Sequence, residues 1–178
     1  IAAIESCKTP PKVFISSSAV GFYGNRGDET LIESSHKSSG WLSRLCNQWE
    51  RSSYPSHPEN LTSTRVVNLR TGIVLGDGGA LKKMLLPFKM GLGGTLGNGN
   101  QWMPWIHIED MVRIIIESIN NENIYGPING ACIVLQGNIW LWNLAEGFLQ
   151  AHVDITAIAL EHLSRASKAP NPVGPPQS

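Results

Sequence analysis

Three serines at the end of a short apolar segment are the first residues of this sequence that could do chemistry. Residues 12–18 (KVFISSS) end in Ser16, Ser17 and Ser18, and Tyr23 follows shortly after them. Serine and tyrosine hydroxyls held together can hydrogen-bond a substrate carbonyl and pass a proton to it. Small hydroxyl residues also cap backbone groups where a strand leaves a sheet. Taken alone, the pattern favours the capping interpretation, and the catalytic interpretation stays open.

A series of regularly spaced glycines follows the serines. Gly21, Gly24 and Gly27 have the GxxGxxG spacing that can place a dinucleotide pyrophosphate over a helix N-terminus. In such a motif the next residues form a helix that packs on the sheet, but residues 28–39 carry no apolar stripe. We therefore expect these glycines to form a loop that does not bind phosphate.

A second cluster, of polar and aromatic residues, lies in residues 97–110 (GNGNQWMPWIHIED). Gly97, Gln101, Trp102 and Trp105 could line a ligand pocket with apolar walls and a few polar contacts. The alternative is that both tryptophans belong to the core and that the two acidic residues stabilise the N-terminus of a following helix. The histidine before them is interpreted as an interior, hydrogen-bonded side chain.

The elements that must position these residues alternate between strand and helix. Residues 12–18 and 64–75 are apolar and β-branched and predict buried strands, and residues 102–108 are expected to be extended. Such alternation is typical of βαβ units, so the sequence predicts an α/β fold with a parallel sheet and flanking helices. Ligand sites of these sheets gather at the carboxyl ends of the strands, where the serines lie.

Helical spacing of apolar residues predicts the three helices between and after these strands. Trp41, Leu42, Leu45, Cys46 and Trp49 form the apolar stripe of the first helix. The second and third are expected over 80–90 and 110–120. Their inward residues are expected to be Leu81, Met84, Leu85 and Phe88 in the second, and Met111, Ile114, Ile115 and Ile119 in the third.

Composition excludes several classes of function. The chain has 178 residues, and 14 basic residues balance 14 acidic ones, so the electrostatic footprint of a nucleic-acid-binding protein is missing. No apolar run approaches the roughly 20 residues that cross a bilayer, so we expect no membrane span. Three cysteines without a CxxC pair favour neither a disulfide framework nor a structural metal site. A cytoplasmic protein is expected, with organelle import left open because the chain does not begin with Met.

Four segments together resemble a known family: residues 13–24, 41–50, 65–112 and 126–130. In this order they are similar to the extended short-chain dehydrogenase/reductase superfamily, of the NAD-dependent epimerase/dehydratase type. The closest resemblance is to an atypical epimerase-like subfamily, some members of which carry a cell-division-inhibitor label. The resemblance implies that residues 1–130 are the C-terminal half of an NAD(P)-binding, Rossmann-like domain, with the N-terminal half of the fold missing.

The resemblance also implies roles for individual residues. Ser18 takes the position of the catalytic serine beside the nicotinamide, and Tyr23 is the nearest hydroxyl that could act with it. The residues expected to contact the cofactor are Ser16, Ser17, Arg70, Thr71, Gly72, Ile73 and Val74. The residues expected to contact the substrate are Gly97, Gln101, Trp102 and Trp105. No metal site is implied.

Two departures from the family pattern bear on the chemistry. The superfamily's Tyr-x-x-x-Lys pair is replaced by Leu42 and Cys46, so the usual tyrosine–lysine proton relay is excluded. The arginine that pairs with the diphosphate of nucleotide sugars is also missing, because Met103 and Pro104 stand at the Arg-Asp positions. The substrate is therefore expected to be a small molecule other than a nucleotide-diphosphate sugar.

A third departure concerns the extent of the fold. The glycine-rich phosphate loop of the family would precede the first residue, so NAD(P) is expected to bind the intact protein, and to bind this chain alone weakly or not at all. Residues 131–163 are expected to be a divergent helical segment and residues 164–178 a proline-rich, disordered tail. Two functions stay open. One is an epimerase-like enzyme. The other is a non-catalytic, cofactor-binding regulatory protein, for which the label of some family members suggests a link to cell division.

Overall fold

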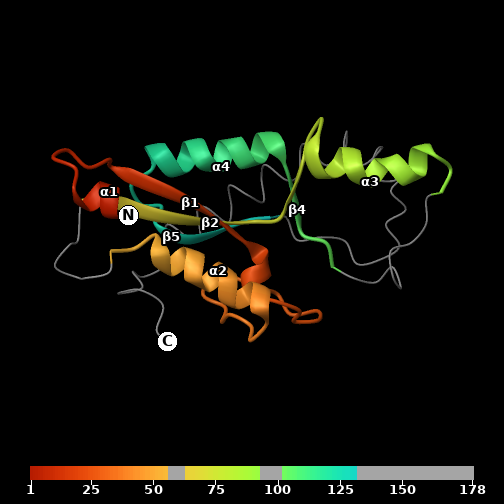
Figure 1. Cartoon of the computed structure of the whole chain (residues 1–178), viewed down its shortest axis with the longest axis horizontal. Coiled ribbons are helices and arrows are strands. Elements are labelled where there is room, and N and C mark those ends of the chain that lie inside the picture. Colours follow the sequence, from red (N-terminus) through yellow and green to blue (C-terminus); the bar gives the residue numbers. More distant parts are fainter. Residues whose placement is uncertain (56–62, 93–101, 132–178) are drawn as a thin grey trace.

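A parallel sheet organises the part of the chain that the computed structural model describes, which is residues 1–55, 63–92 and 102–131 (Figure 1). Strands β1 (Val13–Ala19), β2 (Arg65–Thr71) and β5 (Gly126–Gly130) pair in the order β1-β2-β5, and both pairings are parallel. Two shorter strands, β3 (Ile73–Leu75) and β4 (Trp105–His107), form a second parallel pair. The predicted α/β fold with a parallel sheet is confirmed.

The strand predicted over residues 64–75 is divided into β2 and β3 at Gly72. The Gly72 amide donates to the Gly130 carbonyl (3.0 Å), and the next amide, of Ile73, donates to the Pro104 carbonyl (2.9 Å). A Cβ atom at Gly72 would lie 2.8 Å from the Pro104 oxygen, which is closer than a side chain tolerates. The chain therefore changes its pairing partner, from β5 to β4, at the one residue type that lets the two backbones approach this closely.

Helices lie on both faces of the sheet. Figure 1 shows α4 (Ile108–Asn120) on one side of β1, β2 and β5, and α2 (Trp41–Ser52) on the other. Helix α3 (Gly79–Lys89) follows β3, and the short α1 (Ala2–Glu5) and the 3-10 turn η1 (Val20–Phe22) flank β1. This arrangement confirms the flanking helices predicted from sequence. The helix and tail expected after residue 131 lie outside the described residues.

The two faces of the sheet differ in polarity, because successive side chains of a strand point to opposite faces. On the α4 side, Val67, Leu69 and Ile128 form an apolar core with Met111 and Ile114 of the helix. On the α2 side, Val66 is the buried apolar residue of β2, and the other buried strand residues are polar. They are Ser18, Asn68 and Arg70, and each of them is hydrogen-bonded to a residue in or just after α2.

The prediction that the apolar stripe of α2 is buried is wrong, and the polar face of the sheet explains why. Trp41 and Trp49 are 71% and 48% exposed, whereas Ser43, Cys46 and Glu50 are the buried residues of the helix. The polar side chains of the strands need hydrogen-bond partners, and the Ser43–Cys46–Glu50 face supplies them. Only Cys46 of the predicted stripe is buried.

The other two helices follow their predictions more closely. In α4, Met111 and Ile114 are buried as predicted, but Ile119 is 51% exposed because it lies on the helix face that points away from the sheet. Helix α3 covers most of its predicted range and continues past Pro87 to Lys89. Its Leu81, Met84 and Leu85 are half-buried, and the side chain of Phe88 lies outside the described part of the chain.

Candidate functional site

The carboxyl ends of β1 and β2 lie side by side, and this brings the predicted site residues of two segments together. In the parallel register Ser18 is opposite Arg70, and Ala19 is opposite Thr71. The predicted catalytic serine and the predicted cofactor-binding arginine are therefore neighbours across the sheet, although 52 positions separate them in the sequence. The predicted function of this edge depends on that juxtaposition.

Ser18 is held by a glutamate that the sequence analysis did not single out. Its side chain is buried, and its Oγ donates a hydrogen bond of 2.8 Å to Glu50 Oε1. Glu50 lies near the end of α2 and is itself only 3% exposed. Glu50 lies one helical turn after Cys46 and therefore on the same face of α2. The sequence alone did not show that this face is the buried one, so it did not identify Glu50 as a buried residue.

The Glu50 carboxylate is paired with Arg70 in a two-pronged arrangement. Arg70 Nε lies 2.8 Å from Glu50 Oε1, and Arg70 Nη2 lies 2.8 Å from Glu50 Oε2. Two parallel charge-assisted hydrogen bonds of this kind fix both the distance and the plane of the carboxylate. Burial on its own would lower the pKa of Arg70, but its hydrogen bonds to Glu50 and the interactions with Tyr23 and the Glu50 charge outweigh burial and leave the pKa raised. The guanidinium is therefore charged.

One flat face of the Arg70 guanidinium and its third nitrogen, Nη1, also have partners. The guanidinium lies 3.6 Å from the centre of the Phe22 ring, which is the geometry of a cation–π contact. Its Nη1 donates to the Tyr23 hydroxyl (2.8 Å) and to the Glu33 carbonyl (3.0 Å). Arg70, which was predicted to border the nicotinamide, thus donates its hydrogen bonds to Glu50, Tyr23 and Glu33.

Tyr23, the second predicted catalytic residue, is a buried anchor for Arg70. Its hydroxyl accepts from Arg70 Nη1 and donates to Asn129 Oδ1, over 2.7 Å. Burial raises the pKa of Tyr23 above its ordinary value of 10.0, against the opposing effect of the Arg70 charge. The phenol is therefore protonated at neutral pH, and its proton is already shared with Asn129.

A loop between η1 and α2 closes over this network. The Asn129 amide donates to Glu33 Oε1 (3.0 Å), and the Glu33 carbonyl accepts from Arg70. The loop of residues 25–39, which contains Glu33, is thus attached to the end of β5 and to Arg70. Sequence reasoning did not single out Glu33 or Asn129: Glu33 lies outside the segments that carry the family resemblance, and Asn129 lies within one of them, but no role was inferred for it.

The other predicted cofactor-binding residues lie along the same strands. Ser17 of β1 is exposed and Ser16 is half-buried. Thr71 is half-buried at the end of β2, and its hydroxyl donates to the Leu69 carbonyl (3.2 Å). Gly72 is the residue at which β2 ends, and beyond it Ile73 is half-buried and Val74 packs against the apolar core.

The predicted substrate-binding residues are only partly within the described structure. Gly97 and Gln101 lie outside it. Trp102 is 40% exposed, and its indole nitrogen donates to Asp28 Oδ1 of the 25–39 loop over 2.8 Å. Trp105 is half-buried in β4. Trp102 therefore connects the segment before β4 to the loop that covers the buried network.

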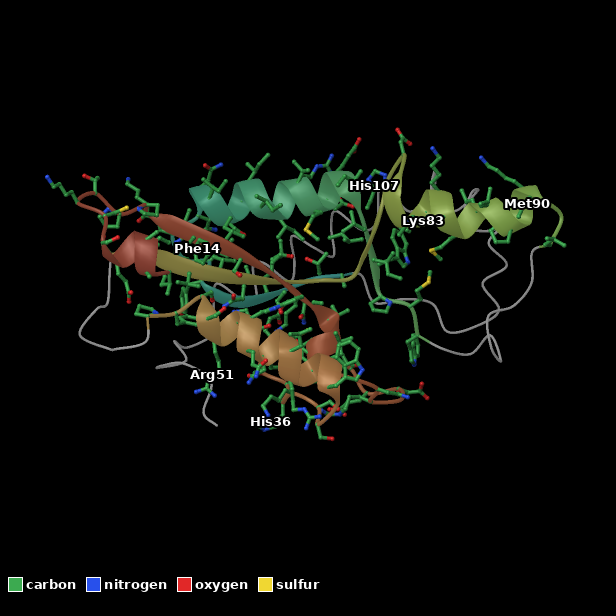
Figure 2. The ribbon with its side chains drawn as sticks, viewed as in Figure 1. Phe14, His36, Arg51, Lys83, Met90 and His107 are labelled. Atoms are coloured by element: carbon green, nitrogen blue, oxygen red, sulfur yellow. The ribbon has the colours of Figure 1, made fainter. Side chains whose placement is uncertain are left out.

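Two further sequence interpretations concern His107 and the glycine series. Figure 2 labels His107 where β4 runs into α4; the side chain is half-buried and caps the helix, because its Nδ1 accepts from the Glu109 amide (3.3 Å). At Gly24 and Gly27 the backbone has φ values of 65° and 57°, and no helix follows them in residues 28–39. The glycines form a loop, as predicted.

The positions of the missing tyrosine–lysine pair contain no proton relay. Cys46 is fully buried against Phe22 and Tyr23, and burial raises the pKa of its thiol. Leu42 packs against Gly21, where a Cβ atom would lie 2.6 Å from a Leu42 methyl carbon. Both positions are therefore packing positions.

Two negative findings apply to residues 1–55, 63–92 and 102–131. No helix there is both long and apolar enough to cross a membrane. In the same ranges, no three His, Cys, Asp or Glu side chains cluster closely enough to hold a metal ion.

Comparison with known proteins finds one family. The chain matches the model of the NAD dependent epimerase/dehydratase family over residues 1–129. It is 40% identical over 121 residues to the "Epimerase family protein SDR39U1 homolog, chloroplastic" of Arabidopsis thaliana, a match that covers 67% of this chain and 34% of that protein. The word "chloroplastic" in this name describes the Arabidopsis protein.

Two solved structures are similar to the fold. One is the crystal structure of human epimerase family protein SDR39U1 (isoform 2) with NADPH, at 34% identity and a TM-score of 0.69, covering 77% of this chain and 46% of that one. The other is a nucleoside-diphosphate sugar epimerase from Corynebacterium glutamicum, at 30% identity and a TM-score of 0.66, covering 97% of this chain and 34% of that one. This chain thus spans half or less of the length of each of these relatives.

Proposed function

Because the chain belongs to the NAD-dependent epimerase/dehydratase family, we propose that residues 13–130 form the nicotinamide-side part of an NAD(P)-binding protein. That protein acts on a small molecule other than a nucleotide-diphosphate sugar. The observation that carries the proposal is the parallel pairing of β1 with β2, which puts Ser18 and Arg70 at one edge of the sheet. Ligands of open α/β sheets bind at such carboxyl edges.

The residues at this edge fit the nicotinamide end of the cofactor. Ser17 is exposed and Thr71 is half-buried at the point where β2 ends. Small polar groups of this kind suit a flat heteroaromatic ring with a carboxamide. The pyrophosphate has no comparable place in the described residues, because the glycine series at 21–27 opens no helix.

Each residue of the edge has a distinct part in this proposal. When bound, NAD(P) supplies hydride transfer, and the protein supplies position and electrostatics. Ser18 contacts the reacting groups through its hydroxyl oxygen, and Arg70 with Glu50 holds Ser18 in place. Tyr23 keeps Arg70 oriented and, since its proton is shared with Asn129, is a positioning residue in preference to a proton donor.

The exclusion of nucleotide-diphosphate sugars follows from the segment before β4. Met103 and Pro104 stand where a diphosphate-binding arginine would be, and the Pro104 carbonyl is used by the Ile73 amide. A neutral segment cannot clamp a diphosphate through paired charged hydrogen bonds. The name of the Corynebacterium relative points the other way, to a nucleoside-diphosphate sugar, so the substrate class needs a direct test.

The test uses a chimera in which the residues that precede the matched region of the human NADPH-bound relative are joined ahead of this chain. Isothermal titration of NADPH into the chimera is expected to give binding at least about a hundredfold tighter than into the chain alone, because the chimera regains a pyrophosphate site. UDP-glucose is expected to give no binding heat with the chimera. Micromolar NADPH binding by the chain alone, or tight UDP-glucose binding, would contradict the proposal.

The same chimera separates an enzyme from a non-catalytic cofactor-binding protein. It is given NADPH and a panel of small carbonyl compounds, and NADPH oxidation is followed by absorbance. Turnover that collapses in Ser18→Ala supports an enzyme, since the serine oxygen is lost while Arg70 and Glu50 stay paired. Tight NADPH binding without turnover on any compound supports the regulatory alternative, which the replacement of the tyrosine–lysine pair by Leu42 and Cys46 favours.

A further inference from the structure

The direction of the hydrogen bond between Ser18 and Glu50 determines what Ser18 can offer a ligand. Ser18 Oγ and Glu50 Oε1 are 2.8 Å apart, so one of them donates a proton to the other. Glu50 is held by the charged Arg70 through both of its oxygens, and a carboxylate has no proton to give. The proton in the bond is therefore the hydroxyl proton of Ser18.

The surroundings of Glu50 prevent this bond from reversing. Arg70 donates to both Oε1 and Oε2 of Glu50, and its third nitrogen, Nη1, is held by Tyr23 and Glu33. The Glu50 and Arg70 side chains are 3% and 4% exposed, so water does not compete for either. A carboxylate anchored in this way keeps the Ser18 hydrogen pointed toward α2 and away from the open edge of the sheet.

What remains available on Ser18 is a hydrogen-bond acceptor. A serine oxygen has one proton and two lone pairs, and the proton is already committed. Within residues 1–55, 63–92 and 102–131, the structure gives the Ser18 side chain Glu50 as its hydrogen-bond partner and no donor to its oxygen. Ser18 lies near the carboxyl end of β1, opposite Arg70 of β2, and is 4% exposed, so a ligand has to reach its oxygen from the carboxyl edge of the sheet.

We infer that Glu50 is a positioning residue that makes Ser18 accept, and not donate, a hydrogen bond from the ligand. The site then selects a ligand group that carries an N–H or O–H donor at this point, such as a carboxamide or an alcohol, over a group that offers only a carbonyl oxygen. This inference rests on the proposed function, and it names the chemical class of ligand that the proposed function leaves open.

The probes are two pairs of small ligands that differ in the donor. Nicotinamide and 3-acetylpyridine share a ring and a carbonyl, but only nicotinamide has N–H donors. Cyclohexanol and cyclohexanone form the matching alcohol and ketone pair. Each is titrated at millimolar concentration into the 178-residue chain, and its dissociation constant is read from the NMR shift of the Ser18 amide. The first pair reports on a cofactor carboxamide and the second on a substrate hydroxyl.

The donor member of at least one pair is expected to bind about tenfold more tightly than its carbonyl partner. Glu50→Gln should abolish or reverse this preference, since the amide oxygen of glutamine would turn to Arg70 and its NH2 group would donate to Ser18, which frees the serine proton. Ser18→Ala, which leaves the Arg70–Glu50 pair intact, should remove the preference. Glu122→Gln makes the same chemical change at an exposed residue and should keep it.

A ligand-free measurement tests the arrangement itself. In a mixture of H2O and D2O, a serine hydroxyl that exchanges slowly splits its own Cβ signal into two through the deuterium isotope shift. The Ser18 Cβ signal is expected to be split in the wild-type chain and to merge in Glu50→Gln. One averaged signal in the wild-type chain would overturn the inference.

The outcomes separate the inference from the proposed function. Equal binding of both members of each pair at Ser18, or a donor preference that survives in Ser18→Ala, overturns the inference alone. If none of the four ligands shifts Ser18, the ligand assignment falls together with the proposed function. A split Cβ signal in that case would still show that Glu50 holds the serine proton.

Discussion

Arg70 and Glu50 place two opposite charges on the polar face of the sheet, with side chains 4% and 3% exposed. Removing two charges from water is expensive, and the attraction between them offsets this only when the geometry is good and other hydrogen bonds are satisfied. Here Ser18, Tyr23 and Glu33 complete the hydrogen bonding of the pair. The arrangement therefore specifies one side-chain geometry more than it adds stability, which suits residues that hold the hydroxyl to which we assign contact with the ligand.

The first prediction concerns the loss of one partner. Glu50→Ala is expected to lower the free energy of unfolding by about 3–5 kcal/mol, because it leaves the Arg70 charge buried without its carboxylate. Urea denaturation followed by circular dichroism measures this loss. Glu122→Ala, at an exposed position, should change stability by less than about 0.5 kcal/mol. A similarly small effect of Glu50→Ala would mean that the pair does not exist in solution.

The second prediction concerns pH. Burial raises the pKa of Tyr23, and likewise that of Tyr54, above the ordinary value of 10.0. The folded chain then holds these protons more tightly than the unfolded chain, so the stability that they contribute is complete below pH 10 and is lost as the pH rises through their folded pKa values. Tyr23→Phe should make the decline of the unfolding free energy above pH 10 less steep.

Urea denaturation at a series of alkaline pH values measures that slope. Tyr125→Phe is the control, because it removes a phenol that is 38% exposed and makes no contact with Arg70 among the hydrogen bonds of the described residues. An unchanged slope in Tyr23→Phe would show that the Tyr23 phenol is not buried in solution.

At the scale of the elements, α2 presents its small and polar residues to the sheet. Ser43 illustrates this, since its hydroxyl lies 2.5 Å from the Phe22 carbonyl oxygen and 2.8 Å from that of Ser38. These two contacts attach the start of α2 to the end of η1 and to the loop that covers the site. The large apolar residue nearby, Trp41, is 71% exposed.

The third prediction follows from this inverted face. Ser43→Ala is expected to cost about 1–3 kcal/mol of stability, because the Ser38 carbonyl loses its side-chain donor and the Phe22 carbonyl keeps only the Ser38 amide. Trp41→Ala, although it removes a far larger side chain, should cost less than about 0.5 kcal/mol, as exposed positions usually do. Thermal and urea unfolding of the two variants in parallel decide the matter. If Trp41→Ala proves the more destabilising, the orientation of α2 is wrong.

The existence and type of these elements could be predicted from sequence, because apolar periodicity reports local structure. The serines at the end of β1 were found in this way, whereas the role of the arginine at the end of β2 was implied by the family resemblance. Glu50, Glu33 and Asn129 could not be found, since their roles come from partners far along the chain. The Tyr23–Asn129 contact joins residues 106 positions apart, and the Asn129–Glu33 contact joins residues 96 apart.

The orientation of α2 was mispredicted for a related reason. Its apolar stripe contains two tryptophans, and such a stripe ordinarily faces the core. The face of the sheet beneath it carries Asn68 and Arg70, whose side chains need polar partners from the helix. A periodic pattern in one helix holds no information about the polarity of the strands that it covers.

At the scale of the whole molecule, the chain combines an apolar core under α4 with a polar, hydrogen-bonded layer under α2. The apolar side has the ordinary role of a core, because burial of residues such as Val67, Leu69 and Ile128 supplies most of the driving force for folding. The polar side ends at the carboxyl edge of β1 and β2. One face of the sheet thus maintains the fold, and the other holds the residues to which we assign contact with the ligand.

The most direct test of the central claim asks which end of the dinucleotide meets this edge. Intermolecular NOEs are recorded between NADPH and the chimera described above, in which Ser18 and Thr71 are selectively labelled. The account predicts contacts from the nicotinamide ring protons to the side chains of both residues, and none from the adenine protons. Contacts from adenine alone, or nicotinamide contacts confined to residues outside 13–130, would contradict it.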